Sequence, residues 1–111
     1  MAETRKLFGP TSASASGVWT DVSDLRPSKT LYMEALESGA SAQIRAANGP
    51  KPSTSASGSV LVTLAGDGNP AFPAPTLIQQ HFDWIIFNKT GVGASPVSTI
   101  CYLAGEQQRD G

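Results

Sequence analysis

Short runs in which apolar and polar residues alternate constrain this chain more than any other feature of its sequence. The clearest run covers residues 40–46, where four apolar residues alternate with Ser41, Gln43 and Arg45. Because successive side chains of a strand point to opposite faces, this pattern predicts a β-strand with one buried and one hydrated face. Similar runs predict strands at 18–22, 29–38, 59–64, 77–88 and 97–104.

Two of these segments need a closer interpretation. Residues 29–38 contain Leu, Met, Glu and Ala, which also favour helix. A strand is preferred because Pro27 precedes the segment and Ser38-Gly39 ends it after a short distance. The second half of 77–88 is apolar on both faces, which predicts a central strand covered on both sides. A hairpin turn is expected directly after it, at 88–93.

Clusters of Gly, Pro and Ser separate the runs, and no segment has a long amphipathic helical pattern. A parallel sheet would need crossover connections of about a dozen residues or more, usually helical. We therefore expect an all-β fold, an antiparallel β-sandwich of the jelly-roll type.

The 111 residues suit one domain. Residues 1–17 carry few apolar groups and a tract rich in Ser and Ala, which predicts a flexible N-terminal arm. The sandwich is expected to span 18–105 and to be followed by a polar tail at 106–111. Within the sandwich, residues 48–58 contain two prolines and two glycines and predict a long exposed loop.

Charged residues make up 15% of the chain, and its formal net charge is −1. A protein without a basic field is not expected to bind nucleic acid or an anionic membrane. The sequence has no signal peptide and no apolar stretch long enough for a membrane span, so synthesis in the cytoplasm is expected. Its single cysteine excludes an internal disulfide, and the small core indicates that assembly contributes stability.

Reactive groups are few. His81 is the single histidine, with Asp83 two residues away as a conceivable orienting group, but no Gly-x-Ser-x-Gly motif supplies a nucleophile. Cys101 lies in an apolar run and is expected to pack in the core. Asp67-Gly-Asn69 lacks the later Glu of a calcium loop, and Gly91-Val-Gly93 lacks the rest of a dinucleotide fingerprint. We expect no catalytic residue, no metal and no cofactor, and therefore no enzyme.

Apolar residues in polar surroundings are the candidates for partner binding. Leu7 and Phe8 follow Arg5 and Lys6 in the predicted arm, and Phe72 lies among three prolines. The prolines restrict the backbone, so that an exposed Phe72 would reach a partner at low entropic cost. The alternatives are that Phe72 folds back as a cap of the core and that the arm is a disordered terminus.

Taken together, the low charge, the polar arm and the runs Ser59–Leu64 and His81–Phe87 resemble the small capsid decoration, or cement, proteins of short-tailed bacteriophages, the staple proteins of the epsilon-fifteen type. The resemblance implies a jelly-roll-like subunit, commonly a homodimer, on the outer surface of a virion. Such a protein is made in the host cytoplasm, binds the major capsid protein and clamps neighbouring subunits to stabilise the shell. It has no catalytic residues and no small-molecule substrate.

Two other functions fit the same residues. In a carbohydrate- or receptor-binding module of a phage particle, Trp19, Tyr32 or Trp84 would stack on sugar rings. Burial of both tryptophans would count against this hypothesis. In a small hydrolase, catalysis would depend on His81.

Overall fold

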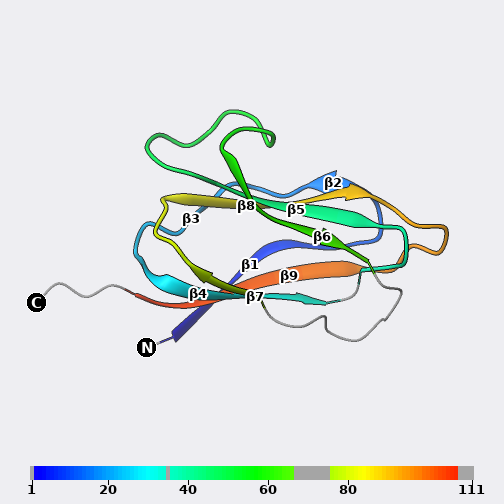
Figure 1. The fold of residues 1–111 in the computed structure, drawn as a ribbon, viewed down its shortest axis with the longest axis horizontal. Helices are drawn as coiled ribbons and strands as arrows, with labels where there is room; N and C mark the ends of the chain where they lie inside the picture. Colours follow the sequence, from blue (N-terminus) through cyan, green and yellow to red (C-terminus); the bar gives the residue numbers. More distant parts are fainter. Residues whose placement is uncertain (1, 35, 67–75, 108–111) are drawn as a thin grey trace, which may run out of the picture.

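The computed structural model describes residues 2–34, 36–66 and 76–107. Two antiparallel sheets pack face to face, and the described residues contain no helix (Figure 1). The expected all-β sandwich is confirmed. The strands are β1 (Ala2–Thr11), β2 (Ala15–Ser16), β3 (Thr20–Asp21), β4 (Leu25–Glu34), β5 (Ser41–Ala47), β6 (Ser59–Ala65), β7 (Thr76–Gln79), β8 (Trp84–Gly91) and β9 (Thr99–Gln107).

The chain crosses between the two sheets several times. Sheet A has the order β1-β9-β4-β7, and sheet B has the order β2-β8-β5-β6, with β3 also pairing with β8. Neighbouring strands are therefore often distant in sequence, and the first described strand lies beside the last, with Ala2 opposite Glu106. Both sheets contribute to one core, which includes Leu31 and Leu103 from sheet A and Ile44 and Phe87 from sheet B.

Most of the alternating runs form strands as expected, but 18–22 contains only the two-residue β3, with Val18 exposed, and the strand within 29–38 ends at Glu34. Burial along β5 alternates at every residue, with Ala42, Ile44 and Ala46 inside. The segment that also favoured helix is part of β4, where Leu31 and Met33 are buried and Tyr32 is exposed. Apolar spacing therefore decided between strand and helix here, because a period of two buries one face of a strand and no face of a helix.

The N-terminal segment differs from the expectation of a flexible arm. Residues 2–11 form β1, which pairs with β9 along its length. Leu7 and Phe8 are only 4% and 5% exposed, and the Phe8 ring lies 4.8 Å from the ring of Phe87 between centroids. Pairing with β9 satisfies the backbone, and burial of two large side chains offsets the entropy of ordering the segment.

The C-terminal boundary also shifts. Glu106 and Gln107, which were expected in a polar tail, belong to β9. The remainder of that tail, 108–111, lies outside the described residues.

The segment 77–88 forms two strands in place of one. β7 belongs to sheet A and β8 to sheet B, because the chain crosses the core between them at 80–83. β8 is central, as predicted, between β5 and the short strands β2 and β3. Asn88 and Thr90 lie inside β8, so the prediction of a hairpin turn that starts at Asn88 is wrong.

β8 is covered on both sides, and the outer cover is the 48–58 loop (Figure 1). Ile85 and Phe87 face the core, while Trp84, Ile86 and Asn88 alternate with them on the outer face. The Trp84 indole N–H donates to the Gly49 carbonyl at 2.9 Å, and the Asn88 amide donates to the Ser55 carbonyl at 2.9 Å. The segment predicted as an exposed loop is therefore fastened onto sheet B, and Ile86 is buried.

Two lysines lie buried in the sandwich. The Lys29 ammonium group donates to three backbone carbonyls, the nearest that of Gln80 at 2.6 Å, and lies 4.4 Å from the centre of the Phe82 ring. Burial lowers the pKa of Lys29. Lys89 forms an ion pair of 2.8 Å with Glu37, and neither side chain is more than 4% exposed. Charges withdrawn from water in this way must be paired or hydrogen-bonded.

Candidate interaction surfaces

The outer face of sheet A presents aromatic and apolar side chains. Tyr32 lies opposite Tyr102 in the pairing of β4 with β9, and Lys6 lies opposite Tyr102 on the other side. Leu77 is 58% exposed and Tyr32 is 38% exposed. We call this surface the Tyr face; its residues are Lys6, Thr30, Tyr32, Leu77, Ile100, Tyr102 and Ala104.

The chemistry of the Tyr face suits contact with another protein. Of these seven residues only Lys6 is charged, and the rest are aromatic, apolar or hydroxyl-bearing. Glu106, two residues beyond Ala104 on β9, adds an exposed ion pair with Arg26 at the end of the face. Tyrosine supplies a large contact area at low conformational cost, and it is enriched in protein interfaces. The four strands beneath hold these side chains on a rigid support, which reduces the entropy lost on binding.

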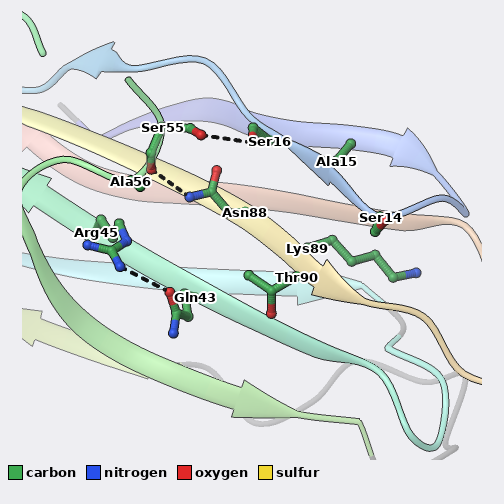
Figure 2. A pocket seen from close by; sticks show the side chains of 10 residues that line it. All are labelled: Ser14, Ala15, Ser16, Gln43, Arg45, Ser55, Ala56, Asn88, Lys89 and Thr90. Atoms are coloured by element: carbon green, nitrogen blue, oxygen red, sulfur yellow. Dashed lines mark hydrogen bonds between the residues drawn. The ribbon is translucent and has the colours of Figure 1, made fainter. Parts of the chain in front are cut away.

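A polar groove of about 370 Å³ lies on the outer face of sheet B (Figure 2). Asn88 joins two of its walls, since its amide oxygen accepts from Gly17 N–H and its amide nitrogen donates to the Ser55 carbonyl. The Arg45 guanidinium makes one long hydrogen bond, 3.4 Å, to the Gln43 amide oxygen. The groove is lined by Ser14, Ala15, Ser16, Gln43, Arg45, Ser55, Ala56, Asn88, Lys89 and Thr90, and it has no aromatic wall.

The tryptophans do not form a platform for sugar rings. Trp19 is buried, and its indole N–H donates to the Thr54 carbonyl at 2.8 Å. Trp84 is half-buried and donates to Gly49. Both indoles fasten the 48–58 loop, and Tyr32 belongs to the opposite sheet. The three aromatic residues proposed for stacking therefore do not lie on one surface.

We expect Trp19→Phe to loosen the middle of the 48–58 loop. The substitution keeps an aromatic six-membered ring and removes the pyrrole ring with its N–H, and loss of that hydrogen bond costs about 1 kcal/mol. Hydrogen exchange at amides 53–57 should become about fivefold faster, because local opening then costs less. Trp84→Phe is the matched control, since it removes the bond to Gly49 at the other end of the loop. Unchanged exchange at 53–57 in Trp19→Phe would show that this indole does not fasten the loop.

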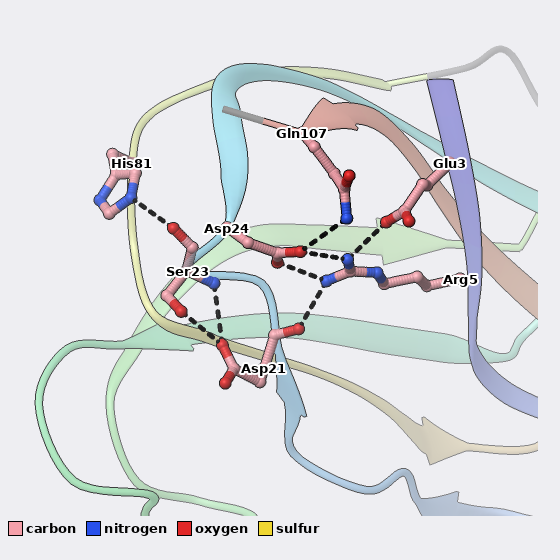
Figure 3. A network of polar contacts seen from close by, with 7 residues as sticks. All are labelled: Glu3, Arg5, Asp21, Ser23, Asp24, His81 and Gln107. Atoms are coloured by element: carbon pink, nitrogen blue, oxygen red, sulfur yellow. Dashed lines mark hydrogen bonds and ion pairs between the residues drawn. The ribbon is translucent and has the colours of Figure 1, made fainter. Parts of the chain in front are cut away.

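A network of polar contacts closes one end of the sandwich (Figure 3). Arg5 donates to both carboxylate oxygens of Asp24, at 2.9 and 2.7 Å, and to the Asp21 carbonyl at 2.8 Å, and it also pairs with Glu3. The hydrogen bonds from Arg5 lower the pKa of Asp24 to about 2. Arg5 thus ties β1 to the segment between β3 and β4, and both terminal nitrogens of its guanidinium donate within the chain.

His81 has no catalytic arrangement in the described part of the chain. Its Nε2 lies 3.2 Å from the Ser23 carbonyl oxygen (Figure 3). Asp83, the conceivable orienting group, accepts from Gly49 N–H at 2.7 Å. A hollow of about 480 Å³ beside His81 has mixed walls, which include the polar Asn48, Ser59 and Gln80 and the apolar Leu61 and Phe82. No hydroxyl or thiol is hydrogen-bonded to the imidazole within the described residues, so the geometry gives no support to a hydrolase.

Cys101 packs in the core, as expected from its apolar run. It is fully buried, and burial raises the pKa of its thiol to about 12. A thiol with so high a pKa is neutral near pH 7, which makes it a poor nucleophile.

The structure separates the predicted partner-binding residues. Leu7 and Phe8 lie in the core and cannot serve as exposed anchors, which corrects that expectation. Arg5 is engaged in the end network, whereas Lys6 is exposed on the Tyr face. Phe72 and the segment Asp67–Asn69 lie outside the described residues.

Neither a metal cluster nor a membrane helix is found in the described ranges. No group of three or more His, Cys, Asp or Glu side chains within 2–34, 36–66 and 76–107 could hold a metal ion. No helix in those ranges has the length and hydropathy to cross a bilayer.

Comparison with known proteins does not assign this chain to a family. No family model, no curated protein and no solved structure matches this chain. An inference about its function therefore starts from the sequence and from the surfaces described above.

Proposed function

We propose that this chain is a structural protein of a phage particle. It acts as a decoration, or cement, protein that binds the outside of the capsid and clamps neighbouring major capsid subunits. The observation that carries the proposal is the Tyr face, an open sheet surface with Tyr32 and Tyr102 side by side and Leu77 exposed. Exposed apolar surface of this kind marks sites of protein contact.

The strand order supports a jelly-roll subunit. β2 and β3 both pair with β8, so they count as one interrupted strand. With eight strands numbered along the chain, sheet A has the order 1-8-3-6 and sheet B has the order 2-7-4-5. This order corresponds to two Greek keys folded together, an architecture shared by capsid and lectin domains. The fold alone does not decide the function, because one architecture hosts many.

The composition supports the same role. A capsid repeats its subunits many times, so a protein that makes weak contacts to each can still hold the shell through multiplicity. A homodimer would make the clamp bivalent. The low charge of the chain, 15% charged residues with a net charge of −1, permits close approach to the capsid without strong repulsion.

The proposal predicts that a major capsid gene lies near this reading frame, and the test uses capsids assembled from that gene. The wild-type protein should co-sediment with them, and Tyr102→Ser should weaken binding at least about tenfold, because central aromatic residues carry most of the energy of an interface. Val18→Ser is the matched control, since Val18 is 69% exposed and lies outside the Tyr face. A wild-type protein that ignores capsids but binds a glycan array would favour the carbohydrate-binding alternative, for which the polar groove is the available site.

A further inference from the structure

The sandwich has four sheet edges, and three of them are protected against pairing. β1 carries Glu3, Arg5, Lys6 and Pro10 along one edge of sheet A. β7, at the other edge of that sheet, has only four residues. One edge of sheet B is formed by β2 and β3, which have two residues each. Charges, proline and short length are the usual means by which proteins prevent edge strands from pairing with other chains.

The fourth edge, β6, lacks these three protections, and its pairing with β5 is regular from Val62 to Ala65, beyond a register shift between Val60 and Val62. Ser59–Ala65 forms a strand of seven residues without charge, proline or glycine. In the described part of the chain it has a neighbour on one side only, β5. Val60 is 43% exposed, and Leu61, Val62 and Leu64 are only partly buried against the core. Its backbone donors and acceptors along the free side form a row to which another strand can add.

We propose that β6 pairs with β6 of a second copy of this chain, antiparallel about a two-fold axis near Thr63, within the part of the strand whose pairing is regular. The two B sheets then form one continuous sheet across the dimer. In such an isologous contact a strand meets itself, so a charge near the axis would lie close to its own copy. β6 is free of charge, and the pairing places Val62 opposite Leu64 of the second copy, two apolar residues on the inner face of sheet B that stabilise a cross-strand contact.

This interface goes beyond the proposed function and does not depend on it, because it is measured without capsids. A single pair of seven-residue strands buries a small area, so we expect a dissociation constant on the order of 10 µM. If the capsid-binding proposal is also correct, the dimer carries two Tyr faces, one on sheet A of each copy, and the joined B sheets hold them in a fixed relation. Its second capsid contact then becomes intramolecular, as a clamp requires.

The test places a charge at Thr63, which is exposed and lies opposite Gln43 on the outer face of sheet B. The two copies of residue 63 would lie directly opposite each other, with about 4.5–5.5 Å between their Cβ atoms. We expect Thr63→Lys and Thr63→Glu each to weaken the dimer about tenfold in analytical ultracentrifugation, through repulsion across the axis. An equimolar mixture of the two variants should regain near wild-type association, a result that unfolding cannot produce.

Thr4→Lys is the matched control, because it adds the same charge to the β1 edge, where charges are already present. It should leave the association constant unchanged. The proposal is overturned if the wild-type protein is monomeric at about 200 µM, or if both Thr63 variants dimerise as the wild type does. The proposal is also overturned if the wild-type protein is monomeric and the Thr63→Lys variant loses capsid binding. That result would identify a segment of the capsid protein as the strand that pairs with β6.

Discussion

Replacing Lys89 by methionine is expected to reduce the free energy of unfolding by about 3–5 kcal/mol, the cost of leaving a buried charge without its partner. Lys89 and Glu37 are 0% and 4% exposed at their side chains, with 2.8 Å between Nζ and Oε1. Methionine keeps most of the volume of lysine and removes the charge. Urea denaturation followed by circular dichroism measures the difference.

The rest of the network explains why the pair is tolerated inside the sandwich. Lys89 also donates to the Thr99 hydroxyl at 3.1 Å and to two backbone carbonyls, those of Ser12 and Val97. The second carboxylate oxygen of Glu37 accepts from Gly93 N–H at 3.0 Å. The network therefore joins the residues just after β1, β4 and β8 to the beginning of β9. Every buried side-chain nitrogen and oxygen in the described residues has a hydrogen-bond partner.

The double variant Lys89→Met with Glu37→Leu is the control. It removes both charges, and replacing a buried ion pair by apolar groups is often close to neutral. The double variant should therefore lose much less free energy of unfolding than the sum of the losses measured for the two single variants. Additive losses, or a Lys89→Met cost below about 1 kcal/mol, would show that the pair is not a buried network.

Acid titration gives a second readout of the same pair. Burial by itself would raise the pKa of Glu37, but hydrogen bonds from Lys89 and Gly93 outweigh it and lower the pKa to about 2. A carboxylate with a lowered pKa stabilises the fold above its unfolded value, near 4.5, and this contribution is lost as the pH falls towards 2. The Glu37→Gln variant should lack that part of the slope. Subtracting the unfolding free energy of the variant from that of the wild type at each pH isolates the contribution of Glu37 from that of Asp24, which titrates in the same range.

The strands were predictable wherever one face is buried and the other hydrated. β5 is the clearest example, because Ala42, Ile44 and Ala46 alternate with polar residues, and only a strand buries that set together. The split of 77–88 into β7 and β8 was not predictable in this way. The strands lie in different sheets, and the crossing depends on packing partners that are distant in sequence.

The candidate surfaces depend still more on the fold. Tyr32 was visible in the sequence as an aromatic residue, but Tyr102, 70 positions later, becomes its neighbour only through the register of β4 against β9. Lys89 looked like part of a turn, and its burial depends on Glu37 from another part of the chain. The uncharged run of β6 was visible, whereas its place at a free edge follows from the strand order.

The prediction from composition was least accurate for the N-terminal segment, which was expected to be a flexible arm and forms β1. A Ser- and Ala-rich tract at 11–17 follows Leu7 and Phe8, and averaging over the whole segment hides two side chains that are almost fully buried. Composition measures whether a segment can order itself, whereas β1 is ordered by β9, more than ninety residues away, with Ala2 opposite Glu106. A segment with little apolar content is stable in a sheet when its partner strand supplies the hydrogen bonds and the core.

Phe8→Ala is therefore expected to destabilise the protein by about 3–5 kcal/mol, a range typical of removing a buried phenylalanine. The Phe8 ring packs at 4.8 Å from Phe87, and the two rings join the inner faces of both sheets. A typical small domain is stable by about 5–15 kcal/mol, so deletion of residues 1–8, which also removes Leu7 and most of β1, should abolish cooperative unfolding. Urea denaturation of Phe8→Ala and circular dichroism of the truncated chain measure the two effects.

Lys6→Ala is the control for this prediction. Its side chain is exposed, whereas those of its neighbours on the strand, Arg5 and Leu7, are half-buried and buried. Substitution of an exposed side chain usually changes the free energy of unfolding by less than about 0.5 kcal/mol. The contrast separates a strand that is part of the core from an arm attached to it, because an arm would tolerate all three changes alike. A truncated chain that unfolds with wild-type cooperativity would mean that β1 is dispensable, and the pairing of the first strand with the last would then contribute little to the sandwich.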